Sequence, residues 1–97
     1  MSLYIALLRW TDKGIADLKK SPARVDAAKE AYKKAGGELK AIYLTMGQYD
    51  LVTIAEAPSD EVAARLGLSL GALGNVRSET LKAYSEADFR KIVASLP

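Results

Sequence analysis

The chain has 97 residues, of which 49% are hydrophobic and 27% charged, and its formal net charge is +2. This length and composition predict one globular domain, residues 1–97, rather than a disordered chain. The chain has no histidine and no cysteine, so it cannot by itself build a Ser-His-Asp triad, a His- or Cys-ligated zinc site, a His-held haem or a disulfide. We expect neither a metal nor a cofactor.

Membrane and nucleic-acid roles are also disfavoured. No apolar run approaches the roughly 20 residues of a bilayer-spanning helix, and residues 1–10 lack the features of a signal peptide. Absence of cysteine fits a reducing compartment, so we expect a cytoplasmic protein without a membrane partner. Basic and acidic side chains are interspersed rather than gathered in a basic stripe, and no nucleic-acid partner is expected.

The first third of the chain predicts a strand followed by a helix. Residues 2–10 have the alternation of a strand, and the side chains on both of its faces are apolar. This pattern is typical of a strand in a sheet that is covered on both sides. One face carries Leu3, Ile5 and Leu7, and the other carries Tyr4, Ala6 and Leu8. Residues 11–20 predict a loop with a short helical turn. An amphipathic helix follows from Pro22 to about Ala35, with Ser21 as its N-cap, and it ends at Gly36-Gly37.

The centre of the chain predicts a hairpin. Strands are expected over residues 38–46 and 50–57, with a tight turn at Gly47-Gln48 or Gln48-Tyr49 between them. Both strands again carry apolar side chains on both faces. The turn also gathers an amide, a phenol and a carboxylate, which makes it the most chemically varied stretch of the chain.

The remainder predicts helix, strand and helix. The helix over residues 60–73 is capped by Pro58-Ser59-Asp60, and its inward stripe is expected to comprise Val62, Leu66, Ser69, Leu70 and Leu73. Gly67 and Gly71 are interpreted as close-packing positions, because the segment lacks the ending of a phosphate-binding loop. A fourth strand is expected over residues 75–84. Ser85 and Asp88 then form a capping-box-like start to a last helix, short enough to lie across the sheet or its partner.

The order of these elements predicts an α+β, ferredoxin-like βαββαβ fold with a C-terminal helix. Its four-stranded antiparallel sheet carries both crossover helices on one face. The other face is open and mixes aliphatic residues with threonines and tyrosines. Two copies pairing face to face would bury the open face and leave a semi-polar pocket in each half. A homodimer is therefore expected, and a higher oligomer is the alternative.

Three separated segments carry a family resemblance: LYIALLRWTDKGI, YLTMGQYDLVTIAEAP and LGNVRSETLKAYSEADF. They are similar to the GYD domain proteins, small bacterial proteins named for a Gly-Tyr-Asp element. Here Gln48 separates Gly47 from Tyr49, which corresponds to a Gly-x-Tyr-Asp form of the motif. The resemblance covers essentially the whole chain and implies a ferredoxin-like fold and a dimeric α/β barrel. It implies little about activity.

A weaker resemblance relates the chain to the effector-binding domains of leucine-responsive-type transcription regulators. Those domains also have a Gly-x-x-Asp-type turn between strands two and three and a Gly-x-Val segment before strand four, as in residues 47–50 and 74–76 here. The resemblance implies that the turn lies near an inter-subunit amino-acid site. The chain has no room for a DNA-binding helix-turn-helix, so such a role would be that of a separate sensing module.

Five residues are the candidate ligand-binding set: Tyr43, Gly47, Tyr49, Asp50 and Arg77. Each also has a structural explanation. Gly47 can serve a turn that needs positive φ, Asp50 can cap that turn, and Tyr49 can pack at an interface. Arg77 can pair with Glu79 on the same strand face, or it can hold a carboxylate in bidentate fashion.

Two functions from different classes follow. The leading hypothesis is a homodimeric module that binds a polar or carboxylate-bearing small molecule near residues 47–50 and Arg77. The alternative is a cofactor-free dimeric α/β-barrel enzyme acting on a small aromatic or carbonyl substrate, with Asp50 or a tyrosine as its base. A purely structural dimer with an empty pocket is the third hypothesis, and the sequence leaves open whether a reaction is catalysed.

Overall fold

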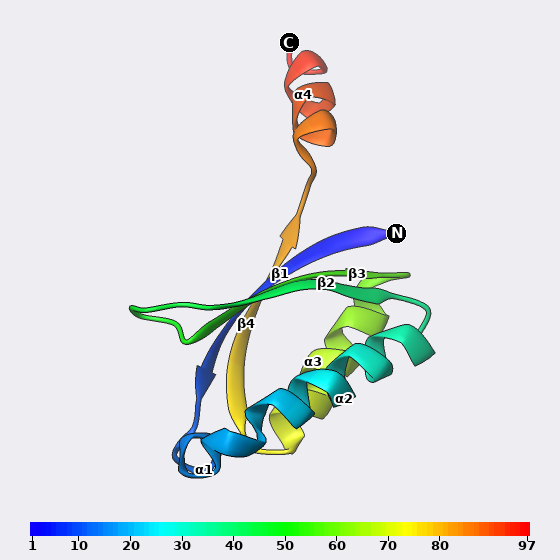
Figure 1. Ribbon diagram of the computed structural model, residues 1–97. Coiled ribbons are helices and arrows are strands. Elements are labelled where there is room, and N and C mark those ends of the chain that lie inside the picture. Colours follow the sequence, from blue (N-terminus) through cyan, green and yellow to red (C-terminus); the bar gives the residue numbers. More distant parts are fainter.

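The computed structural model describes residues 1–97 and has the predicted element order (Figure 1). The elements are β1 (Ser2–Trp10), α1 (Asp12–Ala16), the 3-10 helix η1 (Leu18–Lys20), α2 (Ser21–Lys34), β2 (Glu38–Leu44), β3 (Leu51–Ala57), α3 (Asp60–Ala72), β4 (Val76–Ala83) and α4 (Glu86–Ala94). The strands form one four-stranded antiparallel sheet in the order β2-β3-β1-β4. The predicted ferredoxin-like α+β fold is therefore confirmed.

Helices α2 and α3 cover one face of this sheet, as Figure 1 shows. The predicted alternation in β1 is correct, because Tyr4 and Leu8 are buried on the helix-covered face while Leu3, Ile5 and Leu7 are half-buried on the other. A small core cluster joins Tyr4 to Ala57 on β3 and Ala63 on α3. The face away from the helices has no cover within the chain.

The predicted tight turn after β2 is wrong. β2 ends at Leu44 and β3 begins at Leu51, so a longer loop, residues 45–50, joins them. The Thr45 hydroxyl donates to the carbonyl of Tyr49 at 2.6 Å and closes the loop. Gly47 has φ +153°, a backbone conformation that favours glycine. Hydrogen bonds from Thr45 to the carbonyls of Tyr49 and Asp50 stabilise this longer loop in place of a two-residue turn.

The helix starts are partly as predicted. The Ser59 hydroxyl accepts the N–H of Val62 at 3.3 Å, and the Ser85 hydroxyl accepts the N–H of Asp88 at 3.1 Å. Both satisfy a free donor of the first helical turn. The predicted N-cap at Ser21 is wrong, because η1 runs directly into α2 and Ser21 is already the first residue of that helix.

One expectation about α3 is largely confirmed and one is corrected. Leu66 of the predicted inward stripe is buried, and Ser69, Leu70 and Leu73 line the space between α3 and the sheet, although Ser69 and Leu73 are exposed. Ala63, outside that stripe, is also buried. The glycines Gly67 and Gly71 do not mediate close packing, since a Cβ at either position would meet nothing within 4 Å. Close backbone approach occurs instead at Gly14, where a Cβ would clash with the backbone carbonyl of Asn75.

The C-terminal helix α4 projects away from the sheet and from α2 and α3 (Figure 1). It does not lie across the sheet of its own chain, which was one of its two predicted placements. Its large apolar side chains are consequently exposed: Phe89, Ile92 and Val93, followed by Leu96 just beyond the helix. No helix of the chain has the length and apolar character needed to cross a membrane.

Candidate functional site

The loop of residues 45–50 is held to the end of β1 by Asp50. Its backbone N–H donates to the carbonyl of Leu8 at 2.9 Å, and its carboxylate oxygen Oδ2 accepts the backbone N–H of Trp10 at 3.0 Å. Asp50 therefore continues the pairing of β1 beyond the start of β3. One carboxylate oxygen is engaged by the main chain, which gives Asp50 a positioning role.

Tyr49 spans from this loop to β4. Its hydroxyl donates to Oε2 of Glu79 at 2.8 Å. The guanidinium of Arg9 lies 4.8 Å from the centre of the Tyr49 ring, and its Nε donates to the carbonyl of Gln48 at 2.7 Å. The hydrogen bond to Glu79, with a smaller contribution from desolvation, raises the pKa of Tyr49. Tyr49 is therefore a neutral hydrogen-bond donor, stacked under a cation.

Arg77 lies directly beside Arg9. The two residues are Cα partners in the antiparallel pairing of β1 with β4, and both side chains belong to the open face of the sheet. Neither arginine takes part in any ion pair of the chain. The predicted salt bridge between Arg77 and Glu79 is absent, and Glu79 accepts the Tyr49 hydroxyl. Like charges facing each other across a strand pair are destabilising, so this position favours an anion.

Tyr43 lies on the same face but at the far edge of the sheet. It is 58% exposed. Across the sheet, Tyr43 on β2 pairs with Val52 on β3, Val52 pairs with Leu7 on β1, and Leu7 pairs with Glu79 on β4. Three strand spacings, about 14 Å, therefore separate Tyr43 from Glu79. Tyr43 is thus three strands away from Glu79, although it lies on the strand that enters the loop, and Arg77 joins the cluster through its pairing with Arg9.

Arg9 and Glu79 belong to this cluster but are not among the five predicted site residues. Glu79 was expected only as an ion-pair partner of Arg77. The signal that would have found them is strand register, since pairing β1 with β4 places Arg9 opposite Arg77 and Leu7 opposite Glu79. A one-residue error in strand pairing would reverse that placement.

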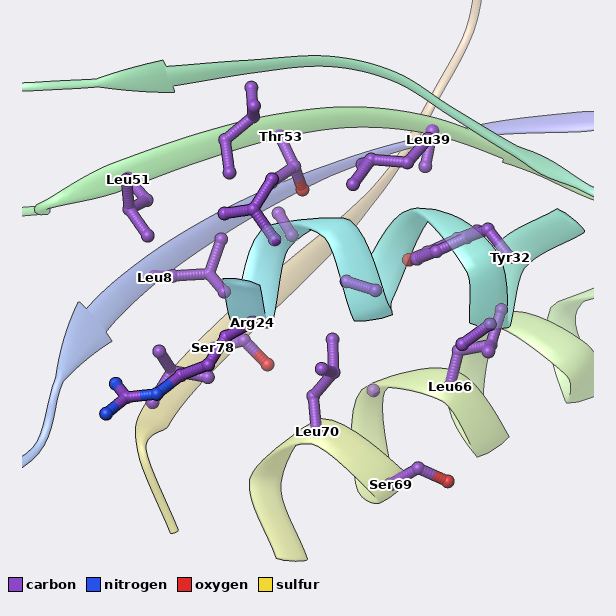
Figure 2. Close-up of a pocket in the computed structure, with 18 of the residues that line it drawn as sticks. Leu8, Arg24, Tyr32, Leu39, Leu51, Thr53, Leu66, Ser69, Leu70 and Ser78 are labelled. Carbon is purple, nitrogen blue, oxygen red and sulfur yellow. The ribbon is translucent and has the colours of Figure 1, made fainter. Parts of the chain in front are cut away.

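A separate cavity lies on the other side of the sheet, between the strands and helices α2 and α3 (Figure 2). Its volume is about 260 Å³, and most of its lining is hydrophobic. None of the five predicted site residues lines it. No group of three or more Asp, Glu, His or Cys side chains is placed to hold a metal ion.

The GYD domain family model matches residues 4–93 of the chain. The protein belongs to the GYD domain family. Its Gly-Gln-Tyr-Asp motif is the loop that Asp50 fixes to β1. A relative from Thermus thermophilus, described as a glutamine synthetase and cystathionine beta-lyase binding protein, is 35% identical over 89 residues. The match covers 91% of this chain and 94% of the relative.

Solved structures agree on the fold. The crystal structure of TTHA0845, also from Thermus thermophilus, is 26% identical with a TM-score of 0.52, over 88% of this chain and 95% of that one. The feast or famine regulatory protein Rv3291c from M. tuberculosis, complexed with L-methionine, is 17% identical with a TM-score of 0.66, over 89% of this chain and 54% of that one. FFRP-DM1, 15% identical, has a TM-score of 0.62 over 87% of this chain and all of that one. The last two similarities concern the fold alone.

Proposed function

We propose that this GYD domain protein is a homodimeric module that binds a small carboxylate-bearing molecule, with Arg77 and Arg9 holding the carboxylate beside Tyr49. The observation that carries the proposal is the pairing of Arg9 with Arg77 on the open sheet face without any acidic partner for either. A guanidinium binds a carboxylate through two parallel hydrogen bonds, and a bound anion would relieve the repulsion between the two arginines.

Glu79 extends the proposal to molecules that also carry an amine. One oxygen of its carboxylate accepts the Tyr49 hydroxyl at 2.8 Å, which fixes the group two residues from Arg77 on the same face of β4. A carboxylate held beside two arginines matches the paired charges of an amino acid. The regulatory protein from M. tuberculosis was solved with L-methionine, which supports amino acids as the first class to test.

The dimer in this proposal pairs the open sheet faces. Half-buried apolar side chains from the central strands occupy the middle of that face, among them Leu3, Ile5, Leu7, Val52 and Ile54. A contiguous apolar surface of this kind is uncommon on a monomer and typical of an interface. Pairing would bring the arginine end of one sheet against the second copy and would exclude water from the site.

The remaining predicted residues have supporting roles in this proposal. Gly47 and Asp50 set the shape and position of the loop that presents Tyr49. Tyr43, exposed at the edge of the same face, is assigned to the contact with the second copy. The Trp10 N–H bonds one oxygen of Asp50 and ties it to β1, which supports a positioning role for Asp50.

A second candidate function is to bind a partner protein. The relative from Thermus thermophilus is described as a binding protein for two enzymes, and α4 here offers an exposed apolar surface that projects from the domain. Protein binding through α4 is compatible with a carboxylate site at the other end of the sheet.

The carboxylate site is tested by calorimetric titration with the common L-amino acids. For L-leucine, the comparison uses 4-methylpentanoate, which lacks the amine, and 3-methylbutylamine, which lacks the carboxylate. We expect loss of the carboxylate to abolish binding and loss of the amine to weaken it. Arg77→Gln should reduce affinity about tenfold or more, as for a lost charged hydrogen bond. Arg65→Gln, the same change at an exposed position of α3, should have no effect. Equal affinities for Arg77→Gln and the wild type would refute this site.

A further inference from the structure

The cavity between the sheet and the helices is lined by side chains from the strands and from both α2 and α3. Leu8 and Leu51 enter it from the strands, Tyr32 from α2, and Leu66 and Leu70 from α3, as Figure 2 shows. The two helices thus stand off from the sheet, and the space between is lined by hydrophobic atoms. This is unusual, because protein interiors are ordinarily packed without voids larger than a water molecule.

The volume of about 260 Å³ is well beyond a packing defect. Water gains little in such a space, because it needs several polar partners that an apolar wall does not offer. A dry apolar cavity of about 150 Å³ binds benzene, which has six carbon atoms. Scaled by volume, this cavity accommodates an apolar ligand of about ten carbon atoms. An apolar ligand would restore contacts that the empty cavity forfeits.

Two polar side chains, Thr53 and Arg24, line the cavity at different places. Thr53 is the buried polar residue of the chain, and its hydroxyl is directed from the sheet towards the helices (Figure 2). Arg24, half-buried on α2, also lines the cavity. Its Nη atoms donate to the backbone carbonyls of Gly14 at 3.3 Å and Asp17 at 2.9 Å, which are neutral acceptors. No acidic side chain forms an ion pair with Arg24.

We propose that this cavity is a second ligand site, distinct from the arginine pair on the open face, and that it takes a medium-chain amphiphile. The apolar chain lies among Leu8, Leu66 and Leu70, and an anionic head group pairs with Arg24. The site belongs to one chain and requires no second copy. It therefore differs from the proposed carboxylate site in face, in chemistry and in its independence of dimerisation.

The test uses decanoate and its uncharged counterpart 1-decanol, below their micelle-forming or solubility limits. Binding is followed by calorimetry and by NOEs between the ligand chain and the methyl groups of Leu66 and Leu70. We expect both ligands to bind in the cavity. Arg24→Gln should weaken decanoate about tenfold and leave 1-decanol unchanged, because only the former carries a charge. Arg77→Gln should change neither.

The cavity itself is tested by filling it. Ala28→Leu adds bulk to a lining residue of α2 and should abolish binding of both ligands, whereas Ala23→Leu, exposed on the same helix, should not. Should Ala28→Leu fail to fold, wild-type protein under xenon pressure gives an independent measurement, with shifts expected at Leu66 and Leu70. Absence of ligand NOEs and xenon shifts at these methyls, or decanoate contacts confined to α4, would overturn the proposal. Failure here would leave the Arg77 test unaffected.

Discussion

Asp50 accepts the backbone N–H of Trp10 on its side-chain oxygen at 3.0 Å, and by this contact the GYD loop is fixed to the end of the central strand β1. Its backbone N–H reaches the carbonyl of Leu8, so one residue bonds to β1 through both its main chain and its side chain. The motif aspartate therefore determines where Tyr49 lies, and through Tyr49 the position of the Glu79 carboxylate.

Replacing this aspartate should cost stability as well as ligand affinity. We expect Asp50→Ala to lower the free energy of unfolding by about 1 to 2 kcal/mol, because it leaves a partly buried N–H without its acceptor. Asp50→Asn retains an oxygen acceptor and should cost less. Urea denaturation measures both, with Asp26→Ala, an exposed change on α2, as the control expected to stay within about 0.5 kcal/mol of wild type. Equal stability of Asp50→Ala and Asp26→Ala would contradict the anchoring role.

Gly14 should be the glycine least tolerant of substitution in a helix. Its backbone packs against Asn75, and a Cβ would clash with that residue's carbonyl oxygen, which also accepts the N–H of Thr11. Gly14→Ala must displace β4 or α1 and should destabilise by about 1 to 3 kcal/mol. Gly71→Ala is the matched change in open space and should stabilise α3 by about 0.5 to 1 kcal/mol. Thermal and urea unfolding of both variants decide this, and a stable Gly14→Ala protein would disprove the contact.

The bond between Tyr4 and Asp60 should make stability depend on pH at both extremes. The Tyr4 hydroxyl donates to Oδ1 of Asp60, and Lys82 also pairs with that carboxylate. The hydrogen bond from Tyr4 and then that from Lys82 lower the pKa of Asp60, so the stability from its ionised form is lost as pH falls below about 4. The hydrogen bond to Asp60 and then burial raise the pKa of Tyr4, so its contribution is lost as pH rises above about 10.

Urea unfolding across pH separates these contributions. Tyr4→Phe should flatten the alkaline decline and reduce the acid decline, because it removes the phenol and also the largest cause of the Asp60 shift. Tyr84→Phe, at an exposed tyrosine beyond β4, should leave the profile unchanged. An identical pH profile in Tyr4→Phe and wild type would show that the Tyr4 bond does not form in solution.

Helix α4 should contribute to association rather than to the stability of the domain. It projects from the sheet with its apolar side chains exposed (Figure 1). Deleting residues 86–97 should therefore leave the unfolding midpoint at low protein concentration close to that of the full chain. The deletion should weaken self-association or partner binding, which sedimentation velocity measures. A large loss of stability in the monomer would show that α4 packs on its own domain.

The element order was predictable because each helix start and each strand carries a local signal. Ser59 and Ser85 cap their helices through their own hydroxyls, and the alternation in β1 separates Tyr4 and Leu8 from Leu7 as the structure does. Such signals act over a few residues. The family resemblance and the fold similarity then agree with the pattern.

The site and the cavity were less predictable, because the site depends on strand register and the cavity depends on the distance between the helices and the sheet. Arg9 and Arg77 are far apart in sequence and meet only through the pairing of β1 with β4. The burial of Ala63 on α3 was not predicted, because it follows from packing against Tyr4 and Ala57 rather than from the spacing of the helix's leucines. The cavity likewise results from the placement of whole layers.

Native mass spectrometry of freshly purified protein tests the central claim most directly, with Ile54→Glu and Leu68→Glu as a matched pair. Ile54 lies in the middle of the open face, and Leu68 is 75% exposed on α3. We predict a wild-type dimer that carries a small acid released on denaturation. Leu68→Glu should keep both properties, and Ile54→Glu should be a monomer without the acid, because a buried glutamate is costly. A monomeric wild type, or an Ile54→Glu dimer that still carries its ligand, would contradict pairing through the open sheet face.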